Sequence, residues 1–308
     1  MDIVRHTLKK YEIIEKYLGA CKILFESERK PNFLYIDGYS GPGKVHFEDS
    51  DWGINKLIAG SPLIAIEKLN PEKSKKISCV FIENDSKNFS DLESYIGTIK
   101  NVKCLQGDAN LKIFEVLDKI SPFTVVTILL DITKYNELKW NTVENIAHHK
   151  KPYGTDIIIH LPFYTMNAYN NWENDPEGIT NFFGCDDWKQ LYEKKRNGVL
   201  EIREFEEEIV NLYKKRLGEV AGYSVVKSVP IRHVQSLKQT QRTIYYLIYG
   251  SNNEKAAKNI MDYVMDDKTL HRYLNKYIKT LEEWGKLEKE KIKNKLTLFD
   301  FSNKIIKS

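Results

Sequence analysis

Short apolar runs that end in an acidic residue recur along the first half of the chain, and a segment with helical spacing follows most of them. Four successive runs end at Asp37, Glu83, Asp108 and Asp131, and a fifth, "TDIIIHLP", begins at Thr155. Nearly continuous apolar runs are typical of strands that are buried on both faces. Their alternation with helices predicts a doubly wound α/β fold, in which helices cover both faces of a mostly parallel sheet.

The remaining segments predict additions to this sheet. Residues 3–26 place apolar side chains at helical spacing, and residues 166–218 interrupt the alternation with an insertion that is helical from about 186 onward. The runs "GYSVVKSVPIR" and "RTIYYLIYGSN" predict a hairpin at the sheet edge, and residues 253–265 predict a closing helix. We therefore expect one α/β domain over residues 1–265 and a basic, partly helical extension over 266–308.

Composition excludes several classes of protein. The four cysteines contain no C-x-x-C pair, which argues against a disulfide framework or a structural zinc site. No apolar stretch approaches the roughly 20 residues that span a bilayer, and the charged N-terminal segment does not read as a signal peptide. These features predict a cytoplasmic protein without a membrane partner. The net charge of +4 permits a nucleic-acid partner without requiring one.

The first apolar run continues into "FLYIDGYSGPGK", residues 33–44, whose glycines let the backbone approach a ligand closely. A P-loop for a nucleoside triphosphate would need Ser or Thr where Val45 stands, and Asp37 would repel phosphate. A dinucleotide site would need G-x-G-x-x-G opening directly into a helix. Here a polar stretch delays the next helix, for which Ser61 is the predicted N-cap and Pro62 the first helical residue.

S-adenosylmethionine suits these residues better, because it carries a sulfonium and an ammonium group and no phosphate. Asp37 suits the positive groups, Glu83 is placed to accept the ribose hydroxyls, and Asp108 is placed to accept from the adenine amino group. The alternative is that these acids are ordinary solubilising residues at strand ends. The predicted cofactor-binding residues are Asp37, Gly38, Tyr39, Ser40, Gly41, Gly43, Glu83, Asn84, Asp108 and Ala109.

Several segments resemble the three-Cys-motif partner (TcmP) family. The resemblance rests on "YIDGYSGPGK", "AGSPLIAIE", "FIENDSKNF", "TNFFGCDDWKQLY" and "IYYLIYGSNNEKAAKNIMDYVM", and it extends from residue 6 to about residue 265. The family is similar to class I S-adenosylmethionine-dependent methyltransferases, so the resemblance implies their Rossmann-like fold and their cofactor. It also implies a partner protein, encoded nearby, that carries a three-cysteine motif.

The fourth strand departs from the pattern that this resemblance implies. Amino-directed nucleic-acid methyltransferases carry Asp/Asn-Pro-Pro-Tyr/Phe there, and the family tends toward an Asp-Pro-Phe-Gly-like version. In "LLDITKYNELKW" Asp131 is kept, but Ile132, Thr133 and Lys134 follow it. Asp131 is the predicted acceptor for a substrate amine, and Tyr135 is the candidate stacking ring. The alternative is a purely structural role for Asp131.

Aromatic and amide side chains follow the fifth strand, in "HLPFYTMNAYNNW". They are suited to stack on and hydrogen-bond an unpaired base, or equally to pack the following helical segment. The predicted substrate-binding residues are Lys134, Pro162, Phe163 and Tyr164. His148 and His149 point apart on a helix and have no third ligand, so we predict no metal site there.

Three functions remain open from the sequence. The first is methyl transfer from S-adenosylmethionine to a nucleic acid. The second is a catalytically degenerate cofactor-binding subunit that acts as a partner of another protein, which the altered "DITK" motivates. The third is a nucleic-acid-processing enzyme that uses the acids at the strand ends to bind a metal.

Overall fold

The computed structural model describes most of the chain up to residue 254. The described residues are 2–3, 5–27, 29–49, 53–150, 152–235, 238–254, 257, 264 and 286. Most of the predicted closing helix and nearly all of the predicted C-terminal extension therefore lie outside the described residues. The predicted domain boundary at residue 265 stays a prediction.

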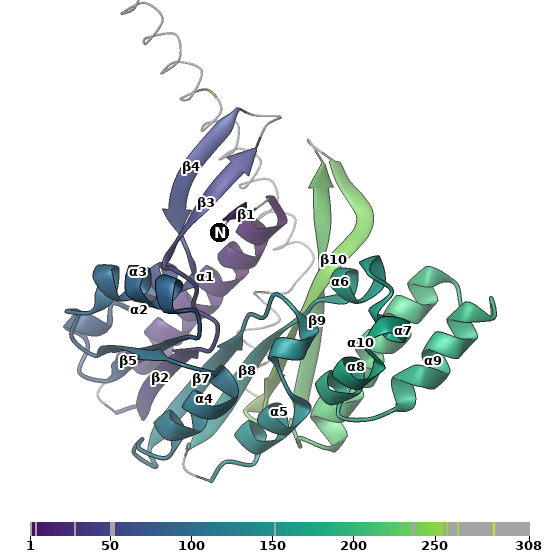
Figure 1. Cartoon of the computed structure of the whole chain (residues 1–308). Coiled ribbons are helices and arrows are strands. Elements are labelled where there is room, and N and C mark those ends of the chain that lie inside the picture. Colours follow the sequence, from purple (N-terminus) through teal and green to yellow (C-terminus); the bar gives the residue numbers. More distant parts are fainter. Residues whose placement is uncertain are drawn as a thin grey trace, which may run out of the picture.

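Seven strands of the described chain form one sheet in the order β6-β5-β2-β7-β8-β10-β9 (Figure 1). The first five of these are parallel, whereas β10 runs antiparallel to both of its neighbours. The bounds are β2 Asn32–Asp37, β5 Ile77–Glu83, β6 Val102–Gln106, β7 Thr124–Leu130, β8 Gly154–Leu161, β9 Val225–Gln235 and β10 Lys238–Ser251. This is the predicted doubly wound, mostly parallel sheet, and the predicted edge hairpin is β9–β10.

Side chains of each strand alternate between two apolar cores, one on each face of the sheet. On β2, Phe33 and Tyr35 join the first core, while Leu34 and Ile36 join the second. The first core is covered by α1 (Arg5–Phe25), α2 (Ser61–Leu69) and α3 (Ser86–Ile96); the second lies under α4 (Ala109–Leu117), α5 (Trp140–Ala147) and the helices of the insertion. This burial on both faces explains why the strands are continuous apolar runs.

The predicted insertion is helical from its start. It comprises α6 (Phe163–Ala168), α7 (Asn171–Asn174), α8 (Pro176–Phe183), α9 (Asp187–Arg196) and α10 (Ile202–Glu219). Trp172 anchors these helices, with its ring centroid 5.6 Å from that of Trp188 and 5.2 Å from that of Phe205. The helices therefore begin about 20 residues before the predicted position, because short helices joined by Asn and Gly show little periodicity.

The polar stretch after the glycine loop is a hairpin, which the sequence analysis did not predict. Strands β3 (Lys44–Asp49) and β4 (Ile54–Ala59) pair antiparallel, and β1 (Asp2–Ile3) adds to β3 in parallel. Val45 and Phe47 alternate with exposed or half-buried residues, as a strand with one buried face requires. The N-cap of α2 is Gly60 instead of the predicted Ser61, which is itself the first helical residue.

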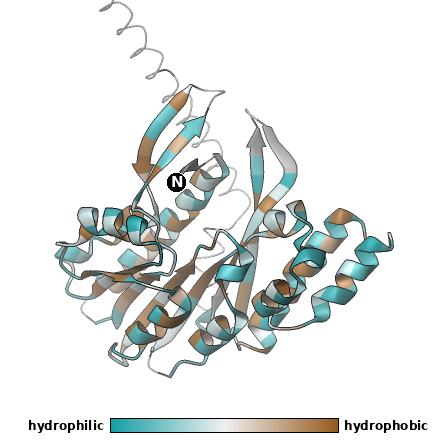
Figure 2. Cartoon of the chain, viewed as in Figure 1, coloured by the Kyte–Doolittle hydropathy of each residue, from teal (hydrophilic) through white to brown (hydrophobic). Residues whose placement is uncertain are grey.

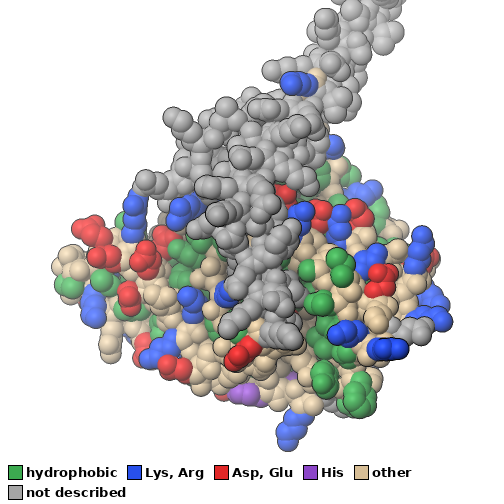
Figure 3. Space-filling view, turned by 180° about the vertical axis from the view of Figure 1, so that it is seen from behind, with side chains coloured by type: hydrophobic (Ala, Val, Ile, Leu, Met, Phe, Trp, Pro, Cys, Tyr) green, Lys and Arg blue, Asp and Glu red, His purple; other side chains and the backbone are tan. Residues whose placement is uncertain are grey.

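Hydropathy follows this arrangement. Figure 2 shows apolar residues along the central strands and polar residues on the outer faces of the helices. On the face shown in Figure 3, Lys and Arg side chains are interspersed with Asp and Glu. None of the helices in the described part of the chain has the length and apolar character that spanning a bilayer demands.

Candidate functional site

The acidic ends of four parallel strands meet at one edge of the sheet. Asp37 and Glu83 are the last residues of β2 and β5, Asp108 follows β6, and Asp131 directly follows β7. The chain order of the strands reverses between β2 and β7, and doubly wound sheets bind ligands beyond the carboxyl ends of their strands at such a point. The structure thus gathers the predicted acids where a ligand is expected.

The glycine loop arches over the ends of the neighbouring strands. The backbone N–H of Gly38 donates to the carbonyl of Leu129 (2.9 Å), and that of Ser40 donates to the carbonyl of Ile82 (3.0 Å). Gly41 has a φ of +65°, a left-handed conformation that favours glycine. A Cβ built on Gly41 would meet no atom within 4 Å, so the space beside this part of the loop is open.

Asp37 is fully buried beneath this loop. Its Oδ1 accepts a hydrogen bond from the backbone N–H of Tyr39 (3.2 Å), whereas its buried Oδ2 has no partner within the described residues. Burial raises the pKa of the Asp37 carboxyl to about 7, and the charge of Asp131 adds to this shift, whereas the side chain of Ser61 and the backbone of Tyr39 oppose it. An unpartnered buried carboxylate oxygen is costly, and a cationic donor would satisfy it.

Glu83 connects the second strand to the glycine loop. Its Oε2 accepts from the backbone N–H of Gly41 (2.6 Å), and its Oε1 accepts from that of Asp85 (2.8 Å). Both oxygens retain a further lone pair, which leaves the carboxylate able to accept from a ligand as well. Asn84, the next residue, exposes its side chain.

Asp108 is the N-cap residue of α4, where its Oδ1 accepts from the backbone N–H of Asn110 (2.9 Å). Ala109 is buried, and its Cβ lies close to Gly38. The Tyr39 hydroxyl and the Asn110 side-chain amide both donate to the carbonyl of Glu137, at 2.7 Å and 2.8 Å. The glycine loop, the start of α4 and the loop after β7 are therefore held together by hydrogen bonds.

Asp131 is the centre of a buried group of titratable side chains that we call the Asp131 cluster, formed by Lys10, Asp131 and His160. The Lys10 ammonium, from α1, forms an ion pair with Oδ2 of Asp131, and Nδ1 of His160, from β8, lies 3.1 Å from Oδ1. Burial alone would raise the pKa of Asp131, but Lys10 and His160 hold it well below its usual range. Both oxygens of the predicted amine acceptor are thus engaged.

Lys10 and His160 were missed by the sequence analysis. Lys10 lies in a helix with lysines at several positions, and the strand run "IIIHL" gives no reason to expect a charged neighbour for its histidine. The contacts join residues that are 121 and 29 positions apart in the chain. The pairing of β8 with β7 brings His160 to Asp131, and the packing of α1 across the sheet brings Lys10 there.

The other predicted catalytic residue, Tyr135, lies in the core. Its side chain is nearly fully buried, and its hydroxyl donates to Oδ2 of Asp175 (2.8 Å) at the start of α8. This hydrogen bond and burial of the ring both raise the pKa of the phenol. Tyr135 therefore fastens the loop after β7 to the insertion, with its ring in the apolar core.

The predicted substrate-binding residues divide into two pairs. Pro162 and Phe163 are buried at the start of α6, where the Phe163 ring centroid lies 6.2 Å from that of Phe205. Lys134 is exposed, and Tyr164 is half-buried with the Arg242 guanidinium 4.0 Å from its ring centroid. Only the second pair presents side chains to a molecule that approaches from outside.

Metal ligands do not gather in the described part of the chain: no three His, Cys, Asp or Glu side chains lie together as a metal ion would need. His148 is the C-cap residue of α5, and Nε2 of the neighbouring His149 lies 3.1 Å from Oδ1 of Asp118.

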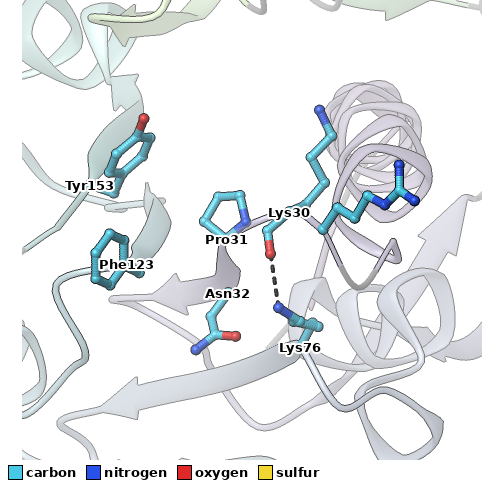
Figure 4. A pocket seen from close by; sticks show the side chains of 7 residues that line it. Lys30, Pro31, Asn32, Lys76, Phe123 and Tyr153 are labelled. Carbon is cyan, nitrogen blue, oxygen red and sulfur yellow. Dashed lines mark hydrogen bonds between the residues drawn. The ribbon is translucent and has the colours of Figure 1, made fainter.

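A separate hollow of about 490 Å³ lies at the opposite, amino ends of the strands (Figure 4). Two of the residues that line the hollow are joined by a hydrogen bond, in which the Lys76 ammonium donates to the carbonyl of Lys30 (2.9 Å). Its lining residues are Arg29, Lys30, Pro31, Asn32, Lys76, Phe123 and Tyr153. The hollow shares no residue with the acidic edge and is not part of the candidate site.

Comparisons with protein-family models and with curated proteins find no match. Among solved structures, the chain is similar to a Legionella pneumophila protein of the DUF519 family, with 12% identity, a TM-score of 0.47, and coverage of 83% of this chain and 92% of that one. It is also similar to the Methanococcus jannaschii fibrillarin pre-rRNA processing protein, with 14% identity, a TM-score of 0.40, and coverage of 72% of this chain and 66% of that one. A third similar structure is the CurJ carbon methyltransferase, with 12% identity, a TM-score of 0.37, and coverage of 73% of this chain and 50% of that one.

Proposed function

We propose that the chain binds S-adenosylmethionine at the acidic edge of the sheet and transfers its methyl group to a nucleic acid. The observation that carries the cofactor assignment is the buried Oδ2 of Asp37, which has no partner among the described residues and lies beneath a glycine loop with open space beside Gly41. The cofactor has a cationic ammonium group that would satisfy this oxygen. A phosphate-bearing ligand would instead bring negative charge to a buried acid.

The other residues of the edge fit the rest of the same cofactor. Glu83 would accept hydrogen bonds from the ribose hydroxyls through its remaining lone pairs, and the start of α4, with Asp108 and Asn110, would face the adenine amino group. Gly41 would let the backbone pass close to the methionine part. When bound, the cofactor supplies an electrophilic methyl group on a sulfonium.

A nucleic-acid acceptor is supported by exposed and half-buried side chains near this edge. Tyr164 and Arg242 form a ring–guanidinium pair on α6 and β10, and Lys134 extends from the loop after β7. An aromatic ring serves a base by stacking, while cations serve the phosphates.

Isothermal titration tests the cofactor assignment. We expect micromolar binding of S-adenosylmethionine and of its demethylated product, and loss of both in Asp37→Ala. Asp91→Ala, on the exposed face of α3, is the matched control and should bind as the wild type does. Absence of binding to correctly folded wild-type protein would refute the proposal. Transfer of a tritiated methyl group to RNA and DNA then tests the acceptor.

A second candidate is a cofactor-binding subunit that does not itself transfer the methyl group. The full engagement of Asp131 and the burial of Tyr135 favour it, because neither side chain is free to hold a substrate amine. It predicts cofactor binding without transfer to any nucleic acid. It also predicts that a three-Cys-motif protein encoded nearby co-purifies with this chain.

A further inference from the structure

The protonation states of the side chains in the Asp131 cluster determine which atom donates and which accepts in the hydrogen bond between His160 and Asp131. Asp131 is ionised, because the Lys10 ammonium and the His160 ring hold the pKa of its carboxyl well below the usual range. A carboxylate can only accept, so the hydrogen on Nδ1 of His160 is donated to Oδ1 of Asp131. The neutral ring then carries a lone pair on Nε2.

His160 is neutral, and its surroundings hold the ring in place so that Nε2 can accept a proton. Burial, together with Lys10, lowers the pKa of His160 from its ordinary value, although Asp131 opposes the shift. The Tyr245 ring packs against the imidazole, with centroids 4.0 Å apart, and fixes its plane. Within the described residues Nε2 has no hydrogen-bond partner, and 12% of the His160 side chain remains exposed.

We propose that His160, oriented by Asp131, is the general base for methyl transfer, and that the acceptor is a ribose hydroxyl of RNA. This inference rests on the proposed function. An exocyclic amine would need a free carboxylate and a stacking ring after the fourth strand, whereas here Asp131 is engaged and Tyr135 is buried. A hydroxyl instead needs a base, since oxygen must lose its proton as its bond to carbon forms. Within a nucleic acid, the 2′-hydroxyl distinguishes RNA from DNA.

The step balances without a further reactant. The hydroxyl proton moves to Nε2 of His160 while an oxygen lone pair forms the new bond to the methyl carbon. The carbon–sulfur bond breaks and its electron pair stays on sulfur, so the sulfonium becomes a neutral thioether. The imidazolium that results is stabilised by the Asp131 carboxylate and returns its proton to water. Lys10 keeps Asp131 ionised and in place, and is therefore a positioning residue.

Several titratable groups face His160 and enter its pH dependence. They are His6 and Lys10 of α1, Asp131 and Glu137 of the loop after β7, and Tyr245 of β10. His233 of β9 acts on His6, whose own pKa burial lowers to about 4. His6 is therefore uncharged at neutral pH, and Lys10 is the cation that opposes protonation of His160.

Methyl transfer to an RNA and to a DNA of the same sequence tests the inference. At saturating cofactor we expect the wild type to transfer to RNA alone, with a rate that rises tenfold per pH unit and then levels off as His160 loses its proton. His160→Gln should lower the rate about 100-fold or more and abolish that pH dependence, with unchanged cofactor affinity. The control His148→Gln, which changes the exposed C-cap histidine of α5, should behave as the wild type does.

Each contrary result is informative in a different way. Equal transfer to DNA, an unchanged rate in His160→Gln, or cofactor binding without any transfer to RNA would overturn the inference and leave cofactor binding standing. Failure of the wild type to bind the cofactor would overturn the proposed function as well. Nitrogen NMR of the histidine rings adds a readout without substrate: His160 should be neutral with its proton on Nδ1, and a proton on Nε2 would contradict the proposal.

Discussion

Asp37 is the residue at which stability and the proposed function conflict. Its carboxyl is buried with one unpartnered oxygen, and burial raises its pKa to about 7. A group that stays protonated in the folded protein but ionises near its ordinary value of 3.8 in the unfolded chain costs stability once the pH passes that value. A site that keeps such a residue is prepared for a ligand that supplies a positive charge.

Replacing this carboxyl should therefore stabilise the protein without ligand. We expect Asp37→Asn to match the wild type near pH 3, where the acid is protonated in both the folded and the unfolded state. The free energy of unfolding of the variant should rise relative to that of the wild type as the pH increases to 7, reaching on the order of 4 kcal/mol above it. Urea unfolding of both proteins across this range measures the difference. A variant that is less stable than the wild type at pH 8 would contradict the expectation.

The same titration should govern cofactor affinity. Below pH 7 the Asp37 carboxyl must lose its proton before it can pair with an ammonium group, so binding releases a proton. We expect affinity to rise by up to tenfold per pH unit from pH 5.5 to 7 and then to flatten. Titration calorimetry at pH 6 in two buffers of different ionisation enthalpy counts the released proton. Asp37→Asn should bind weakly and without this release.

At the scale of elements, the glycine loop and the β3–β4 hairpin offer a matched pair of glycines. Gly41 and Gly53 have φ values of +65° and +62°, and a Cβ on either would meet no atom within 4 Å. Alanine at each position should cost about 1 kcal/mol through backbone strain. We expect Gly41→Ala also to weaken cofactor binding at least tenfold, whereas Gly53→Ala should leave it unchanged. Equal affinities in the two variants would mean that no ligand passes Gly41.

Asp156 is the point at which three elements are joined. Its carboxylate accepts from the hydroxyls of Tyr17 on α1 and of Tyr249 and Ser251 on β10, at 2.8, 2.8 and 2.6 Å. Asp156→Ala would leave three hydroxyls without this acceptor in the interior, at an expected cost of about 3–5 kcal/mol. Tyr17→Phe should cost about 1 kcal/mol. Denaturant unfolding measures both, with the exposed Asp91→Ala as the control; equal losses in all three variants would refute this role.

Elements that are defined by local pattern were predictable, and contacts between distant elements were not. The strand ending at Asp37 is visible in the sequence because both of its faces are buried, so its side chains are apolar throughout. The hairpin over Lys44–Ala59 was missed because its strands bury one face and carry charges on the other, which resembles a polar loop. Asp131 was correctly placed at a strand end, but its ion pair with Lys10 depends on how α1 crosses the sheet.

For the whole molecule, the proposed cofactor should act as a stabilising ligand. A ligand at 100 times its dissociation constant that binds only the folded state adds about 2.7 kcal/mol. For a chain of this size we expect the midpoint of thermal unfolding to rise by roughly 4–8 °C. Differential scanning calorimetry measures this midpoint with and without the cofactor. The midpoint of Gly53→Ala should rise as that of the wild type does, and the midpoint of Asp37→Ala should not change. A rise in Asp37→Ala equal to that of the wild type would place the ligand elsewhere.

The sheet order has a consequence for synthesis of the chain on the ribosome. The strand β10 pairs with the free edge of β8, and its first residue lies roughly 80 positions after β8 ends. The strand β9 is synthesised before β10 but pairs with the far edge of β10 and does not contact β8 in the sheet. At a synthesis rate of about 5–20 residues per second, the edge of β8 stays unpaired for roughly 4–16 s before β10 has been made. During that interval its unpaired backbone is open to strands of other chains. The helices α6 to α10 are made within the same interval, so they can shield one face of β8 before β9 and β10 arrive together as a hairpin.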